Sequence, residues 1–150
     1  DFGSSFSFSD KKIGPLFKCD YKYLKEACLK YSKTLPKRMA NICPLIESGK
    51  EVKDTFFWWL CDNFGDRKDV LNEFSANIES YSYVGGPSDS FANYIESRKN
   101  IITPYLQHPN KTVQEWAQRQ IELIDKEVKI ERGQEEYKNH SILKFYTFQK

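Results

Sequence analysis

Apolar residues recur at three- and four-residue steps along most of this chain, the spacing that places them on one face of an α-helix. The runs over residues 21–31, 52–64 and 70–81 show it most clearly, and Gly or Pro separates each run from the next. The pattern predicts an all-α domain of about six or seven helices. The positions expected on the buried faces of these three runs are Leu24, Ala27, Cys28, Tyr31, Val52, Phe56, Trp59, Leu60, Phe64, Val70, Leu71, Phe74, Ile78 and Tyr81.

Prolines and glycines set the expected ends of the helices. The second helix should begin at Pro36, a favoured first position, and continue through Pro44 with a kink. Gly65 is expected to end the third helix in a left-handed conformation. Residues 83–90 contain two glycines and a proline and form the clearest loop. The buried stripe expected on the second helix is Met39, Ile42, Cys43 and Ile46.

The stretch LQHPNKTVQEWA, residues 106–117, ends one helix on proline and begins another within a few residues. Asn110 can cap the new helix by accepting a backbone N–H, and Thr112 with Glu115 offers a rival capping box. The prediction is a helical hairpin. Its first arm would place Phe91, Tyr94, Ile95, Ile102, Tyr105 and Leu106 in helical spacing, and its second Val113, Ala117, Ile121, Ile124 and Val128 on one side with Trp116 at the edge.

The sequence also contains an internal similarity between two of its apolar stripes. A shift of 43 positions aligns Val70 with Val113, and the next apolar positions of the two stripes then coincide. This offset falls within the roughly 40–47-residue period of HEAT and armadillo repeats. The further aligned pairs are Phe74 with Ala117, Ile78 with Ile121 and Tyr81 with Ile124.

Residues 106–110 followed by Val113 and Ala117 resemble the inter-helix turn of a HEAT-like repeat. That turn has a leucine, an Asp-Pro-type turn, a Val-Arg pair and then a small residue; here Gln114 replaces the arginine. The resemblance implies antiparallel hairpins stacked as a short α-solenoid. Residues 56–137 are also similar to C-terminal helical segments of large multidomain bacterial proteins, some of which carry NTPase sensor modules used in defence.

The expected organisation has three parts. Residues 1–20 form an N-terminal extension or linker remnant, residues 21–140 the HEAT-like helical domain, and residues 141–150 a C-terminal tail. The densely charged residues 126–140 are expected to continue the last helix beyond the body. They suit the polar outer face of a terminal capping repeat, and the alternative is a partner-binding arm. Because the chain starts at Asp1, we expect it to be the C-terminal part of a larger protein.

Charge and cysteine content narrow the classes of function. The 23 basic and 21 acidic residues nearly cancel to a net charge of +2, which argues against a dedicated nucleic-acid binder. No apolar run approaches the roughly 20 residues of a membrane span. Four cysteines without a Cys-x-x-Cys pair predict reduced, mostly buried thiols in a cytoplasmic protein that uses no metal or cofactor. They are Cys19, Cys28, Cys43 and Cys61.

The sequence contains no recognisable catalytic motif, and His108 beside Pro109 is expected to be a turn residue rather than a base. The leading hypothesis is therefore a non-catalytic protein-interaction or scaffolding module whose partner is another protein or the rest of its parent chain. Trp58 is either an exposed anchor or packs on a neighbouring helix while Trp59 points inward. The candidate protein-binding residues are Trp58, Gln114, Gln118 and Arg119.

Two alternatives belong to other classes. The first is nucleic-acid backbone binding in a HEAT-like groove, with Trp116 and either Asp62 or Asp66 acting as in the HEAT-like DNA glycosylases. The second is a small autonomous inhibitor or immunity-type protein. The candidate nucleic-acid-binding residues are Lys37, Arg38, Arg67 and Lys68.

Overall fold

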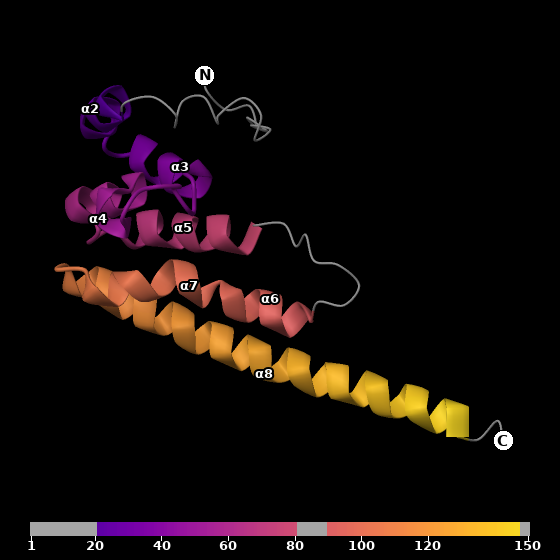
Figure 1. Ribbon diagram of the computed structural model, residues 1–150. Coiled ribbons are helices and arrows are strands. Elements are labelled where there is room, and N and C mark those ends of the chain that lie inside the picture. Colours follow the sequence, from indigo (N-terminus) through magenta and orange to yellow (C-terminus); the bar gives the residue numbers. More distant parts are fainter. Residues whose placement is uncertain (1–20, 81–89, 148–150) are drawn as a thin grey trace.

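The computed structural model describes residues 21–80 and 90–147, and within these ranges every regular element is helical (Figure 1). The all-α prediction is confirmed for this part of the chain. The predicted loop at residues 83–90 lies almost wholly outside it, as do Cys19 and Tyr81. The elements are α2 (Lys22–Lys30), α3 (Leu35–Ile42), the 3₁₀ helix η1 (Val52–Asp54), α4 (Phe56–Phe64), α5 (Lys68–Ser80), α6 (Phe91–Ser97), α7 (Lys99–Ile102), the 3₁₀ helix η2 (Thr103–Gln107) and α8 (Lys111–Thr147).

The helices lie in successive layers (Figure 1). α2 stands at one end, α3 packs on α5 beside α4, and α6 and α7 run along α8. Contacts between α5 and α8 join the half formed by α2 to α5 to the half formed by α6 to α8. The predicted hairpin at residues 106–117 is present, since η2 leads directly into α8 and packs against it.

Asn110, and not the Thr112–Glu115 box, caps α8. The backbone N–H of Thr112 donates to Oδ1 of Asn110 at 2.8 Å. Glu115 lies near Lys111 instead, with Nζ and Oε1 3.7 Å apart. An asparagine directly before the first turn of a helix is well placed to accept from the free N–H groups of that turn, which explains why the helix restarts so soon after Pro109.

Pro44 ends α3 and does not kink it. The last residue of α3 is Ile42, and Cys43 is extended, with φ −64° and ψ 153°. The ring of a proline disfavours the helical conformation of the residue before it, so the helix closes two residues early. Ile46, predicted to face inward, therefore lies past the end of α3 and is 75% exposed. Tyr31, also predicted to face inward, lies just past the end of α2 and is 56% exposed.

The single buried stripe predicted for α4 is too narrow. α4 packs on α5 through Phe57 and on η2 through Trp58, so adjacent residues are buried, and Val52 lies outside α4 in η1. Trp59 is only half-buried, whereas Trp58 is 6% exposed. The helix begins at Phe56, whose N–H donates to Oε2 of Glu47 at 2.7 Å, and Thr55 accepts the N–H of Trp58 at 3.4 Å.

Gly65 does end α4, but for a different reason from the one predicted. Its φ is −63°, a right-handed value open to any residue. Its lack of a side chain matters, because a Cβ there would lie 2.7 Å from Cγ2 of Val113 and 3.0 Å from Nδ2 of Asn110. Gly65 thus lets the end of α4 approach the start of α8.

An aromatic cluster forms the centre of the core. Phe57 stacks on Phe74 with ring centroids 3.3 Å apart, and Tyr105 and Trp116 surround the pair at 5.3 to 6.1 Å. Trp116, predicted at the helix edge, is 4% exposed, and its Nε1–H donates to Oγ of Ser75 at 2.9 Å. Since α4, α5, η2 and α8 each contribute a ring, the cluster joins both halves of the molecule.

α8 continues as one helix past residue 140, where the sequence predicts the start of a separate tail. Acidic side chains of α8 form contacts both with α7 and along α8 itself. Asp125 pairs with Lys99 of α7 and Glu122 accepts from Gln118. None of the helices described is long and apolar enough to cross a membrane.

Candidate interaction groove

An open groove of about 480 Å³ runs along the first turns of α8. Leu106 from η2 lines one side, and side chains of α8 form the rest. Three of the four predicted protein-binding residues line it, although the sequence offered no groove to hold them. Its lining residues are Leu106, Gln114, Glu115, Gln118, Arg119 and Glu122.

Helical spacing brings these side chains together. Gln114, Gln118 and Glu122 stand four residues apart, and such side chains lie one above the other on a helix. Glu115 and Arg119 form the adjacent row. Val113 and Ala117 turn the other side of α8 into the core, so the face that carries these polar side chains is left facing solvent beside η2.

The polar groups of the groove differ in how far they are already engaged. Nε2 of Gln114 donates to the carbonyl oxygen of His108 at 2.6 Å, and Nε2 of Gln118 donates to Oε1 of Glu122 at 3.0 Å. Arg119 is exposed and forms no hydrogen bond or ion pair with the residues described here. Its guanidinium is thus the charged group best placed to bind a partner.

Trp58 does not belong to this groove. It packs in the core with its ring centroid 5.4 Å from that of Tyr105 and 4.6 Å from that of His108. The hypothesis that it is an exposed anchor is wrong, because η2 and the following turn cover it. The alternative, in which Trp58 packs on a neighbouring element, agrees with this placement.

His108 lies in the turn before α8, where its carbonyl oxygen accepts from Gln114 of the groove, and it is only 1% exposed. Its Nδ1 accepts the backbone N–H of Asn110 at 3.0 Å, and its Nε2 lies 2.9 Å from Oδ1 of Asp62. A ring nitrogen that accepts a hydrogen bond carries no proton, so we assign the proton to Nε2, which donates to Asp62. Both nitrogens are therefore used to hold the turn.

The acidic residues proposed for a glycosylase-like site are also engaged at this turn. Asp66 accepts from Nδ2 of Asn110 at 3.0 Å and from Oγ1 of Thr112 at 3.5 Å, while Asp62 accepts from His108. Trp116 lies in the core next to Ser75. The three residues therefore do not gather around an open cleft, and the carboxylates stabilise the start of α8.

The candidate nucleic-acid-binding residues lie at the junction of α3 and α5. Lys68 and Arg38 are exposed, whereas Lys37 and Arg67 are half-buried. Arg67 donates to both carboxylate oxygens of Asp69, at 3.0 and 2.7 Å, and to the backbone carbonyls of Ser32 and Lys33. The hydrogen bond from Arg67 lowers the pKa of Asp69. Arg67 thus holds the α2–α3 connection in place.

Charge is unevenly distributed among the layers. Residues 21–50 contain seven Lys or Arg and two Glu, whereas residues 51–80 contain three Lys or Arg and seven Asp or Glu. One of the two glutamates, Glu47, is engaged by Tyr21, Lys50 and the N–H of Phe56. The end of the molecule formed by α2 and α3 is therefore basic, which the near-zero net charge conceals.

The three cysteines in the described residues, Cys28, Cys43 and Cys61, are free and buried. Burial raises the pKa of Cys28 to about 11 and that of Cys61 well above its ordinary value. Since the thiolate is the reactive form of cysteine, these thiols are inert near neutral pH. Residues 21–80 and 90–147 contain no group of three or more His, Cys, Asp or Glu arranged to hold a metal ion.

Glu115 and Glu122 are groove residues that the sequence analysis did not propose. They share one face of α8 with Gln114 and Arg119. The signal was the three- to four-residue spacing of polar residues opposite the buried stripe. Leu106 was expected inside, and its partial exposure follows from its place at the end of η2.

Comparison with known protein families, with characterised proteins and with solved structures finds no match to this chain.

Proposed function

We propose that this chain is a non-catalytic protein-interaction or scaffolding module. The observation that carries the proposal is the groove beside η2, in which Arg119, Gln118 and Gln114 gather next to Leu106. The groove combines an apolar side chain, two side-chain amides and an arginine that forms no ion pair with the described residues. Protein interfaces combine apolar contacts with hydrogen-bonding groups and arginine in the same way. The partner is another protein or another part of a longer parent chain.

We further propose that the layers are HEAT-like hairpins in a short solenoid. Val70, Phe74 and Ile78 of α5 are buried, as are Val113 and Ala117 at the aligned positions of α8; Ile121 is half-buried. Equivalent helices of stacked repeats must bury the same face in this way. Gln114 stands where the family prefers arginine, and it bonds the turn of its own hairpin instead of forming part of a charge ladder.

Replacing Arg119 with glutamate should abolish partner binding without unfolding the protein. The side chain is exposed, so we expect stability to change by no more than about 0.5 kcal/mol. Reversal of a charge at an interface commonly weakens binding by several kcal/mol, roughly a hundredfold or more in dissociation constant. The measurement is affinity capture from cell extract with the wild-type chain and the Arg119→Glu variant, identified by mass spectrometry.

Lys126→Glu provides the matched control, since Lys126 is exposed on the same helix but does not line the groove. Proteins retained by the wild type and the control but lost with Arg119→Glu would be partners of the groove. Equal capture by all three chains would contradict the proposal.

The basic end of the molecule supports a second candidate function, which is binding of a nucleic-acid backbone through α2 and α3. Clustered cations with few neighbouring carboxylates are what a phosphate backbone requires. We expect labelled oligonucleotides to bind in fluorescence anisotropy, with affinity falling steeply as salt rises. Arg38→Glu should weaken that binding, whereas Lys138→Glu, far along α8, should not. Absence of binding at low salt would exclude this candidate.

A further inference from the structure

Residues 108–110 join η2 to α8, and we call this segment the 108–110 turn. One buried histidine holds it together. The side chain of His108 is 1% exposed, and its Nδ1 accepts the backbone N–H of Asn110 at 3.0 Å. Its Nε2 lies 2.9 Å from Oδ1 of Asp62 on α4. The ring therefore connects α4 to the start of α8.

The hydrogen bond at Nδ1 determines the protonation state of the ring in this structure. A backbone N–H can only donate, so the ring nitrogen that faces it must carry a free lone pair. The ring is therefore neutral, and its one proton lies on Nε2, directed at Asp62. A second proton can be added only at Nδ1, where it would point at the N–H of Asn110. The ring can take up this proton only when the 108–110 turn gives up that hydrogen bond.

The α4 side of the ring favours a positive charge. Among the residues described, Asp62 is the only carboxylate paired with the ring, and its side chain is 49% exposed. The ring of Trp58, also on α4, has its centroid 4.6 Å from that of the imidazole. A nearby carboxylate and the face of an aromatic ring both stabilise a cation. Once protonated, the ring is thus stabilised from α4.

The other elements around the turn present neutral groups to the ring or charges that are engaged elsewhere. Burial raises the pKa of the Tyr105 phenol in η2 well above its ordinary value, so the phenol stays uncharged. Gln114 of α8 faces the turn with a neutral amide, and Asp66 binds the side chain of Asn110. Lys111 and Glu115 of α8 lie 3.7 Å apart, with side chains 85 and 61% exposed. Within residues 21–80 and 90–147, Asp62 is therefore the group that compensates a charge on the ring.

Loss of the hydrogen bond at Nδ1 would affect both α8 and the groove. Asn110 caps α8, since its Oδ1 accepts the N–H of Thr112 at 2.8 Å. The carbonyl oxygen of His108 accepts from Gln114 at 2.6 Å, so the turn also positions one side chain of the groove. A rotation of the backbone that takes the N–H of Asn110 away from the ring moves both groups. Opening of the turn therefore weakens the cap of α8 and displaces Gln114.

We propose that the 108–110 turn is a proton-operated switch, in which Nδ1 of His108 takes up one proton from solvent, releases the N–H of Asn110 and opens the turn. The imidazolium stays paired with Asp62, and no covalent bond to another group changes. Histidine is the side chain whose charge changes between about pH 5 and 8, so we expect a closed turn near the upper end of this range and an open one near the lower end. The switch goes beyond the proposed function and does not depend on a partner in the groove.

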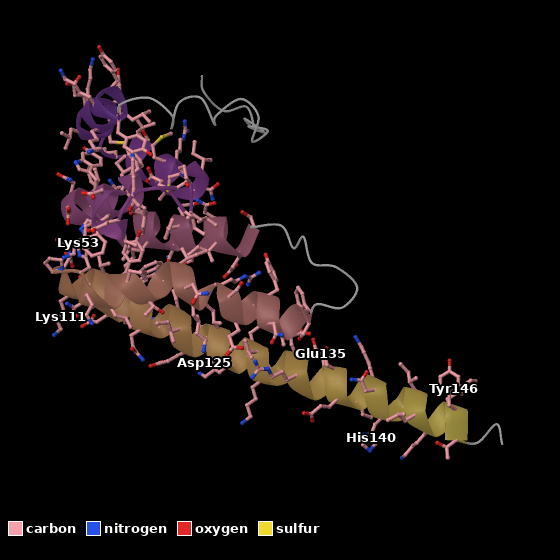
Figure 2. The ribbon with its side chains drawn as sticks, in the orientation of Figure 1. Lys53, Lys111, Asp125, Glu135, His140 and Tyr146 are labelled. Atoms are coloured by element: carbon pink, nitrogen blue, oxygen red, sulfur yellow. The ribbon has the colours of Figure 1, made fainter. Side chains whose placement is uncertain are left out.

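NMR of the full chain between about pH 8 and about pH 5 follows the ring directly. The chain contains two histidines. Figure 2 shows His140 far along α8 from Lys111, the first residue of the helix, so its ring serves as an internal reference. We expect the ring nitrogens of His108 to show the neutral form protonated on Nε2 at the upper pH and the imidazolium at the lower pH.

Hydrogen exchange in the same samples follows the turn. Protection of the Asn110 and Thr112 amides should fall about tenfold or more with the midpoint of the His108 ring, whereas the amide of Phe74 in the core should stay protected. The side-chain amide of Gln114 should change its NMR signal at the same midpoint. A ring that stays neutral down to about pH 5, or protonation without a change at the two turn amides, would overturn the proposal. Loss of protection at Phe74 with the same midpoint would also overturn it, because the whole domain would then be unfolding.

Variants at the two ends of the ring locate the switch. His108→Asn can place its Oδ1 where Nδ1 stands and does not titrate, so the Asn110 amide should stay protected throughout the range. Asp62→Asn removes the charge that compensates the imidazolium, and the midpoint should move about 0.5 to 1 pH unit lower. Asp54→Asn makes the same change at an exposed aspartate of η1 and should leave the midpoint unchanged.

A transition that persists in His108→Asn, or a midpoint that Asp62→Asn does not move, would refute the assignment to this ring. All of these readouts use the chain alone. The Arg119→Glu variant should therefore open its turn as the wild type does, and a failure of the groove proposal is distinguishable from a failure of the switch.

Discussion

Phe74→Ala is expected to lower the free energy of unfolding by about 3–5 kcal/mol, the range for a fully buried phenylalanine. Phe74 has no exposed surface and stacks on Phe57, with Tyr105 and Trp116 at its edges. Truncation leaves a cavity where α4, α5, η2 and α8 meet, and these large rings cannot collapse fully into it. A loss of this size is a large part of the stability of a domain, typically about 5–15 kcal/mol.

Urea unfolding followed by tryptophan fluorescence and by circular dichroism measures this loss. Tyr23→Ala serves as the control, because Tyr23 is an aromatic residue of α2 that is 78% exposed, and its change should stay within about 0.5 kcal/mol. If Phe74→Ala cost no more than Tyr23→Ala, the aromatic cluster would not be the centre of the core.

His108→Ala is expected to cost about 2–4 kcal/mol, although the residue lies in a turn. The imidazole is buried, and its removal both empties a packed site beside Trp58 and leaves the N–H of Asn110 without its acceptor. Equilibrium unfolding in urea gives the value. Because Gln114 also bonds the carbonyl of His108, the groove should lose its shape together with the turn.

Two comparisons isolate the cause of that loss. His140→Ala, on the exposed C-terminal part of α8, should change the free energy of unfolding by no more than about 0.5 kcal/mol. Asp62→Asn keeps an oxygen that can accept from Nε2 and should cost about 1 kcal/mol, less than the loss of the ring. A cost of His108→Ala equal to that of Asp62→Asn would show that the ring contributes only its bond to Asp62.

The sequence alone predicted the helical class, the approximate ends of most helices, and the hairpin at residues 106–117. These features depend on near neighbours along the chain. The alternation of buried and exposed positions on α5 and on the first half of α8 needs only one covered face, and the cap at Asn110 needs only the next two residues. The same local spacing was enough to place Gln114, Gln118 and Arg119 on one exposed face.

Other features could not be predicted because residues far apart in sequence decide them. Gly65 is required by the approach of Val113, and Trp58 is covered by Tyr105 and His108. Pro44 was different: its effect is local, and the rule for the residue before proline would have predicted the end of α3. The missing information elsewhere was which elements pack together.

The groove depends on both kinds of information, the local spacing along α8 and the packing of distant elements. Periodicity determined which side chains of α8 share a face, since a helix has a fixed number of residues per turn. Only the tertiary structure placed Leu106 beside them and engaged Asp62 and Asp66 at the turn. A helix's own geometry follows from local hydrogen bonds, whereas packing follows from burial among all the helices, a property that no short stretch of sequence contains.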